Sequence, residues 1–263
     1  MRSSSCGASI AQNPFAAAST KAPQTLPETH ASAGSGVLFK YNSFSWESFK
    51  MLKFVWGEGG MNMTRQVIPW TSGRWSTEPA ACEEKDGELI VEACQGSDYW
   101  QTTMYGFERD NGHSLLLPWD GEEAVEVTFR LTAFDHLYDQ AGLMLWSHGQ
   151  QWIKAGIEMN DGVPHLGAVV THGYSDWSLA PVPEWMEKIV TIRASRLKDA
   201  VIIRARTQGE GWRTVRVCRL TPDEWQAGPY LCAPTSAGLK VAFTRWATAQ
   251  PDADVHEQPP ESQ

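Results

Sequence analysis

A short segment of the sequence places a lysine and a glutamate on one side of an expected strand. Successive side chains of a strand point to opposite faces, so Lys154 and Glu158 share a face, with Gly156 between them. A glycine at that position removes side-chain bulk from a polar face, which leaves room for a ligand against the backbone. At a rise of about 3.3 Å per residue, the Cα atoms of Lys154 and Glu158 are about 13 Å apart, so these two residues alone cannot form a proton-transfer pair.

Neighbouring segments would supply the partners that such a face needs. Asp139 precedes this strand and Asp176 follows it. A glycosidase needs two carboxyl groups about 5–5.5 Å apart for retention or roughly 6.5–9.5 Å apart for inversion, and Glu158 with Asp139 or Asp176 has that composition. Aromatic rings beside carboxylates, amides and hydroxyls are typical of a site for a polyhydroxylated ligand. The alternative interpretation is that Lys154 and Glu158 are solvated residues on an outer sheet face.

A second polar and aromatic segment, Ser97–Phe107, leads into Arg109-Asp110-Asn111-Gly112-His113. Asn-Gly indicates a turn, and His113 is either a site residue or an ordinary surface histidine. We predict that the ligand-binding residues are Asp98, Trp100, Tyr105, His113, Asp139, Gln140, Trp152, Lys154, Glu158, Ser175, Asp176 and Trp177. If the chain is an enzyme, we predict that Glu158 or Asp176 serves as acid or base and that Lys154 stabilises negative charge.

The elements that must position these residues have the pattern of strands. Runs with period-two alternation predict strands at Glu88–Ala93, Ala124–Thr132, Ala141–Ser147, Trp152–Met159, Leu166–Thr171, Lys188–Ala194, Val201–Arg206, Thr214–Cys218 and Leu239–Trp246. In the second run, hydrophobic residues alternate with Glu126 and Thr128, which predicts one buried face and one wet face.

Turn residues connect several of these runs. Asn160-Asp161-Gly162 and Gln208-Gly209-Glu210-Gly211 predict hairpin turns between neighbouring strands. Thr221-Pro222-Asp223-Glu224 predicts a short helical turn at most, from an N-cap, a proline at the first helical position and a capping-box glutamate. The predicted fold class is therefore all-β, a sandwich of two antiparallel sheets with little helix.

Composition argues against several classes of function. The 263 residues carry a formal charge of −9, and nucleic-acid binding depends on Lys and Arg, so we expect no nucleic-acid partner. The five cysteines lie outside any CxxC arrangement and no HExxH, Walker or GxGxxG motif occurs, so we expect no metal site and no cofactor. Without a signal-like segment or an apolar run of about 20 residues, we expect a cytoplasmic protein with no membrane partner.

The chain is expected to contain one folded domain. Residues 1–36 are rich in Ser, Ala, Pro and Thr, which predicts a disordered N-terminal tail. We expect residues 37–247 to form the domain and residues 248–263 to form a disordered acidic C-terminal tail. Basic residues outnumber acidic ones between Lys188 and Arg219. This excess predicts solvated charge on an outer sheet face, with an acidic protein partner as the alternative.

Five blocks occur in order between about Thr71 and Ala247: Asp98–Thr103 with Tyr105–Phe107, Arg109–His113, Tyr138–Gly142, Trp152–Glu158, and Val169–Thr171 with Ser175–Ser178. Together they resemble the regulation-of-enolase-protein family, otherwise known as a domain of unknown function. The resemblance implies a concanavalin A-like jelly roll with a concave face, and enolase as a candidate partner. Residues 37–70 lack counterparts in these blocks, so an insertion or an extra strand is expected there. Glu158 is followed by Met159, Asn160 and Asp161, so it does not begin the E-x-D-x-x-E or E-x-D-x-E pattern of many glucanases of this fold.

Three functional hypotheses follow. The first is an intracellular lectin-like binding or regulatory module whose polar and aromatic groove accepts a sugar or similar polar metabolite, with a link to enolase or carbohydrate metabolism. The alternative is a small-molecule enzyme of hydrolase, lyase or cyclase type that uses acid and base residues in the same groove. The third is a protein-interacting scaffold that uses the basic face between Lys188 and Arg219.

Overall fold

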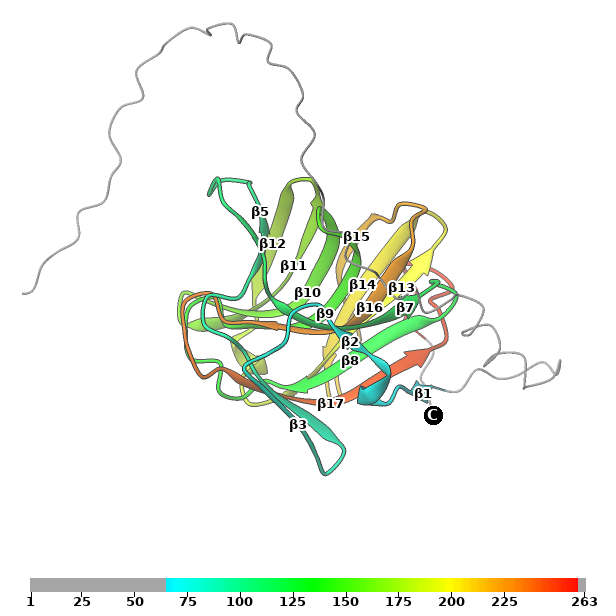
Figure 1. Cartoon of the computed structure of the whole chain (residues 1–263). Coiled ribbons are helices and arrows are strands. Elements are labelled where there is room, and N and C mark those ends of the chain that lie inside the picture. Colours follow the sequence, from blue (N-terminus) through cyan, green and yellow to red (C-terminus); the bar gives the residue numbers. More distant parts are fainter. Residues whose placement is uncertain (1–64, 260–263) are drawn as a thin grey trace, which may run out of the picture. The chain divides into compact units, whose positions relative to one another are not determined.

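The computed structural model describes residues 65–259 as two large antiparallel sheets and one small hairpin (Figure 1). This confirms the predicted all-β, concanavalin A-like jelly-roll sandwich with little helix. Residues 1–64 and 260–263 lie outside the described part. The predicted tail 1–36 and the predicted start of the domain at residue 37 therefore lie outside it as well.

The strands of the eight-stranded sheet are, in spatial order, β15 (Arg213–Arg219), β14 (Ala200–Thr207), β13 (Ile189–Leu197), β8 (Ala124–Arg130), β17 (Lys240–Ala249), β4 (Glu88–Glu92) and β3 (Ala81–Lys85), with β1 (Gln66–Val67) also paired to β17. Those of the seven-stranded sheet are β12 (Ser175–Pro181), β11 (Val163–His172), β10 (Gln151–Asn160), β9 (Gln140–His148), β16 (Trp225–Cys232), β7 (His113–Trp119) and β2 (Arg74–Trp75). A hairpin of β5 (Tyr99–Gln101) and β6 (Glu108–Asp110) and the 3-10 turns η1 (Trp70–Ser72) and η2 (Pro183–Trp185) complete the described part.

Every run predicted as a strand overlaps an observed strand, whereas the short strands β1, β2, β3, β5 and β6 and the longer strands β7, β12 and β16 were not predicted. β16 contains Gly228 and Pro229, two residue types that are unfavourable inside strands, and this conceals its pattern. The helical turn predicted at Thr221–Glu224 is wrong, because this segment forms a bend. Gln151 Nε2 donates to Thr221 Oγ1 and to Asp223 Oδ2, so these side chains hold the start of β10 and cap no helix.

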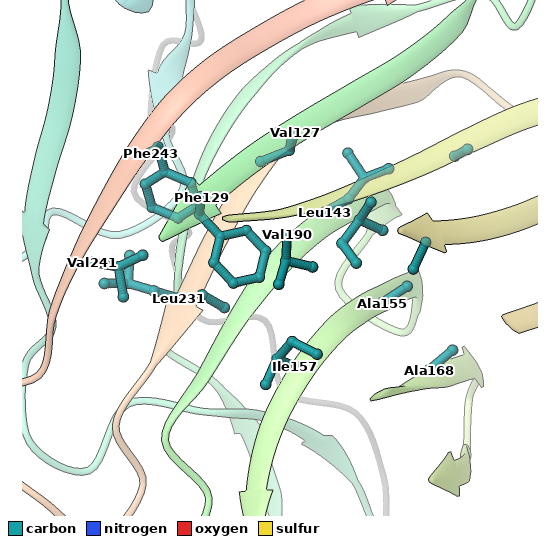
Figure 2. Close-up of a cluster of buried hydrophobic side chains, with 14 of the residues drawn as sticks. Val127, Phe129, Leu143, Ala155, Ile157, Ala168, Val190, Leu231, Val241 and Phe243 are labelled. Atoms are coloured by element: carbon teal, nitrogen blue, oxygen red, sulfur yellow. The ribbon is translucent and has the colours of Figure 1, made fainter. Parts of the chain in front are cut away.

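The main core lies between the two large sheets. Figure 2 shows Phe129 of β8 and Phe243 of β17 packed in the same cluster as Leu143 of β9 and Ile157 of β10. Ile153, Ala155, Ile157 and Met159, which alternate with Lys154 and Glu158 along β10, all belong to this core. The turn between β10 and β11 is also as predicted, since Asp161 and Gly162 have φ values of 50° and 78°, the left-handed pair of a type I′ hairpin.

The outer face of the eight-stranded sheet differs from the prediction. Glu126 and Thr128 of β8 were expected to be wet, but they are only 1% and 5% exposed. Arg193 of β13 lies beside Glu126 in the sheet and donates from Nη1 to Glu126 Oε1 at 2.8 Å. Thr128 Oγ1 forms a hydrogen bond with Thr191 Oγ1 at 3.0 Å. Ion pairing and cross-strand hydrogen bonds therefore bury a polar face that alternation alone assigned to solvent.

The C-terminal segment covers part of that face. Asp252 is 4% exposed, and its carboxylate accepts from Arg193 Nε at 2.9 Å and from Arg204 Nε at 2.7 Å. Arg204 Nη2 also donates to the carbonyl oxygens of Val255 and Glu257, each at 2.9 Å. The predicted disordered acidic tail 248–263 is thus wrong for residues 248–259, because β17 runs to Ala249 and Asp252 pairs with two buried arginines. No helix within residues 65–259 has the length and apolar character that crossing a bilayer requires.

Candidate ligand-binding site

A cavity of about 270 Å³ lies on the face of the seven-stranded sheet that points away from the main core. The β5–β6 hairpin forms one side of it, and Gln101 N donates to Ser175 Oγ at 2.9 Å, which ties β5 to β12 (Figure 1). The lining comprises Gly96, Asp98, Trp100, Tyr105, Phe107, Arg109, Tyr138, Gln140, Lys154, Glu158, Val169, Trp177, Pro234 and Thr235. Seven predicted site residues are therefore brought together: Asp98, Trp100, Tyr105, Gln140, Lys154, Glu158 and Trp177.

The polar floor of the cavity is organised around Lys154. Its ammonium group is buried and donates to Asp98 Oδ1 at 3.1 Å and to Gln140 Oε1 at 2.8 Å. Burial alone would lower the pKa of Lys154, but the carboxylates of Asp98 and Glu158 outweigh burial and raise it. Lys154 is therefore a permanent cation at neutral pH, fixed in place by two acceptors.

Glu158 is the second buried charged group of the floor. Burial raises its pKa to about 7, Lys154 opposes this shift, and Asp98 adds to it. Its Oε1 atom is buried without a hydrogen-bond partner among the residues that the structure describes. A carboxyl group with a pKa near neutrality inside a cavity can accept or release a proton under physiological conditions.

Aromatic rings form the wall of the cavity. Trp100 packs edge-on against Trp177, with ring centroids 6.0 Å apart, and against Tyr105 at 5.5 Å. Trp100 Nε1 donates to the carbonyl oxygen of Thr103 at 2.9 Å, which fixes the indole within the hairpin. Below this wall, the buried ring of Trp152 contacts Tyr99, at 5.8 Å between centroids, so Trp152 supports the site without lining it.

The tip of the hairpin has an unusual backbone. Thr102 and Met104 have positive φ values of 57° and 63°, a region that costs energy for residues other than glycine and especially for a β-branched threonine. Tyr105 and Phe107, which line the cavity, remain 44% and 38% exposed. The strained turn therefore presents two aromatic rings at the rim of the cavity.

Gly156 has a different role from the one predicted. It is paired with Gly142 of β9 and Gly167 of β11. A Cβ atom on Gly156 would stand 2.1 Å from the carbonyl oxygen of Ala141. A void that Gly156 borders has a volume of about 10 Å³, room for about one water molecule. The prediction that this glycine leaves room for a ligand is wrong, because the backbone of β9 occupies that space.

Substituting Gly156 with alanine should lower the free energy of unfolding by about 1–3 kcal/mol, because the added methyl group meets backbone that cannot rotate away. Gly149 is the matched control, since a Cβ atom there would meet nothing within 4 Å. Urea unfolding of Gly156→Ala and Gly149→Ala measures the difference. If the two variants unfold at the same urea concentration, the close approach of the β9 backbone does not require a glycine at position 156.

The structure places other predicted site residues outside the cavity lining. His113 is fully buried, donates from Nδ1 to the Thr77 carbonyl and accepts the Cys94 N–H at Nε2, and burial lowers its pKa. Asp139 accepts the His136 N–H at 3.0 Å and the Ser236 hydroxyl at 2.5 Å. These side chains join segments of the fold and do not face a ligand.

Ser175 and Asp176 were also predicted as site residues, and both lie outside the cavity lining. Ser175 is buried and forms a hydrogen bond with Thr171 in addition to its tie to β5. The Asp176 side chain is 69% exposed and pairs with Arg216 of β15 at 3.1 Å. Its neighbour Trp177 lines the cavity, so Asp176 must point to the opposite face of the strand. Neither the Glu158–Asp176 pair nor the Glu158–Asp139 pair therefore forms a glycosidase centre.

Several lining residues were not among the predicted set. Phe107 and Arg109 follow Tyr105 at two-residue spacing, a strand-like signal that could have identified them. Tyr138 is the first residue of the Tyr138–Gly142 block, whereas Pro234 and Thr235 come from the loop after β16 and carry no sequence signal. Within residues 65–259, no group of three or more His, Cys, Asp or Glu side chains is arranged to hold a metal ion.

Comparison with known proteins places the chain in a family. Residues 75–251 match the family model described as "Protein of unknown function (DUF1349)". The chain belongs to the DUF1349 family. The matched stretch contains all the residues that line the cavity, and the family resemblance expected from the sequence blocks is thereby confirmed.

A sequence match and a structural match to this DUF1349 chain come from Saccharomyces cerevisiae. Regulation of enolase protein 1 is 34% identical over 182 residues, which span 69% of this chain and 91% of that protein. A solved structure of a functionally unknown yeast protein has a TM-score of 0.65 at 32% identity and covers 71% of this chain and 100% of that one. Xylan beta-1,4-xylosidase from Bacillus halodurans C-125, with a TM-score of 0.53 at 14% identity over 41% of its length, shares the fold alone.

Proposed function

We propose that this DUF1349 protein is a lectin-like binding or regulatory module that accepts a sugar or similar polar metabolite in the cavity beside the β5–β6 hairpin. The observation that carries the proposal is the combination of a charged, hydrogen-bonding floor with an aromatic wall in one cavity of about 270 Å³. Ligand sites usually combine an apolar and aromatic lining with a few precisely placed polar groups. Sites for drug-sized ligands have volumes of about 300 Å³ or more. The cavity therefore suits a small polar molecule.

The chemistry of the lining favours a polyhydroxylated ligand. Trp100 and Trp177 offer apolar ring surfaces that can pack against the C–H groups of a sugar. Asp98, Gln140 and Glu158 offer oxygen atoms that can accept hydrogen bonds from hydroxyl groups. A ligand with both kinds of surface on a compact ring matches this arrangement.

The regulatory part of the proposal comes from the relative. Regulation of enolase protein 1 of yeast names enolase in its description. We extend this link to the present chain as an intracellular role in which ligand binding modulates enolase or another step of carbohydrate metabolism. Co-purification of enolase with the tagged full chain, with and without added sugar, tests the partner separately from the ligand.

Direct binding tests the ligand. Calorimetric and glycan-array screening of the wild-type chain should identify a sugar, and Trp177→Ala combined with Glu158→Ala should weaken its binding by at least about tenfold, since each lost contact is worth about 1 kcal/mol or more. Tyr174→Ala is the control, because Tyr174 is an exposed aromatic residue outside the cavity lining. Unchanged binding in the double variant would place the ligand elsewhere.

One observation favours a second candidate function, a small-molecule enzyme. The pKa of Glu158 is about 7, the value expected of a general acid or base. The ammonium group of Lys154 interacts with Glu158 and can stabilise negative charge that develops on a substrate in the same cavity. Incubating the chain with any sugar that binds and following the sugar by NMR distinguishes the two functions. Turnover that disappears in Glu158→Gln would support the enzyme, and an unaltered ligand would support the binding module.

A further inference from the structure

Two donor groups at the floor of the cavity, the Lys154 ammonium group and the Tyr99 N–H, are directed toward the protein. Two of the three N–H groups of Lys154 are directed to Asp98 and Gln140. The backbone N–H of Tyr99 donates to the same Asp98 oxygen at 2.8 Å. These two groups therefore have little capacity left to donate to a ligand beside Glu158, and the other cation of the lining, Arg109, lies on the β5–β6 hairpin.

Acceptors, by contrast, remain open. Glu158 is 8% exposed, and its Oε1 atom is buried with no hydrogen-bond partner among the described residues. An ionised carboxylate accepts hydrogen bonds at both oxygens and donates none. A buried acceptor without a partner is unfavourable until a donor reaches it.

We infer that the ligand presents a hydrogen-bond donor, such as a hydroxyl group, to the carboxylate of Glu158, and that carboxylate and phosphate groups are rejected at this position. This inference rests on the proposed function and specifies which chemical group of the ligand enters first. A carboxylate or phosphate oxygen facing Glu158 would place acceptor against acceptor and like charge against like charge. A hydroxyl group supplies a donor to this carboxylate without adding charge.

Lys154 is the cation that lowers the pKa of Glu158, and a second cation, Arg109 of β6, lines the same cavity. The titratable groups that face Glu158 from the packed elements are Lys154 of β10, Asp98 before β5, Tyr138 before β9, Tyr230 and Cys232 of β16 and the paired His165 of β11. Burial raises the pKa of Glu158 to about 7. Donors from a ligand stabilise the charged carboxylate, so binding must lower this pKa and release a proton.

The sign of the pH dependence therefore reports the chemistry of the ligand. A ligand that presents donors binds the ionised form of Glu158, so its affinity should fall about tenfold for each pH unit below about 7 and level off above it. A ligand that presents acceptors would need the protonated carboxyl group and would bind more tightly as the pH falls.

A charge-matched series of sugars tests the inference. Calorimetric titrations between about pH 5 and about pH 8 would use a neutral hexose, the corresponding hexosamine and the corresponding hexuronate, in the glucose and galactose series. We expect the neutral and cationic sugars to bind with affinity that falls in acid, and the hexuronate to bind at least about tenfold more weakly. Glu158→Gln should abolish the pH dependence, whereas Glu108→Gln, an exposed glutamate on the same hairpin, should retain it.

Each outcome has a distinct meaning. Hexose binding whose affinity is independent of pH, or hexuronate binding that strengthens in acid, would overturn the inference while leaving the binding function intact. Failure of the wild-type chain to bind any of these sugars at any pH would overturn the proposed function, and with it the inference.

Discussion

Replacing Asp252 with alanine is expected to lower the free energy of unfolding by about 3–5 kcal/mol. The carboxylate of Asp252 is buried and accepts hydrogen bonds from Arg193 and Arg204, which are themselves almost completely buried. Removing one partner of a buried ion pair leaves uncompensated charge in a poorly hydrated environment. Guanidinium unfolding followed by tryptophan fluorescence measures the loss.

Asp254→Ala is the matched control for this substitution. Asp254 is an exposed acidic residue two positions along the same segment, and its side chain accepts only the N–H of His256 among the described contacts. Its backbone carbonyl, which contacts Arg204, is kept in the variant. If Asp252→Ala and Asp254→Ala unfold at the same guanidinium concentration, the C-terminal segment does not anchor the sheet as described.

Glu158→Gln is expected to stabilise the protein above about pH 7 by about 3 kcal/mol and to change its stability little below about pH 4.5. The pKa of Glu158 is raised from 4.5 to about 7, so the folded state holds a proton that the unfolded chain has already released. The stabilisation from the neutral carboxyl group is complete below pH 4.5, declines as the pH rises and is lost above about 7. Glutamine stays neutral throughout.

Denaturant unfolding of wild type and Glu158→Gln at about pH 5 and about pH 8 measures this difference. From about pH 5 to about pH 8, the free energy of unfolding of the wild type should fall relative to that of Glu158→Gln. A constant difference would show that the carboxyl group is not destabilised by burial. A residue that reduces stability at working pH is characteristic of a site retained for function.

Period-two alternation predicted more of the site than any motif did. It placed Lys154 and Glu158 on one face and the core residues of β10 on the other, because side-chain direction in a strand depends only on position. The same rule, applied to β12, excludes Asp176 from a site that contains Trp177. The error at Asp176 was therefore avoidable.

Other errors depended on contacts distant in the sequence. Whether the space beside Gly156 holds a ligand or a neighbouring strand depends on Ala141 and Gly142, whose approach no local pattern reveals. The tail was predicted to be disordered from its composition, but Asp252 is held by arginines about 50 residues away in the sequence. Composition reports what a segment can bury by itself and not which partners it meets.

Ligand-induced shifts of the indole N–H signals in an NMR titration test the central claim most directly. With a neutral hexose as the probe, the signals of Trp100 and Trp177 in the cavity wall should shift and saturate together. Those of Trp185 and Trp246, which are buried in the main core, should remain in place. Shifts confined to other tryptophans, or no shift of Trp100 and Trp177 at saturating sugar, would contradict the assignment of this cavity as the binding site.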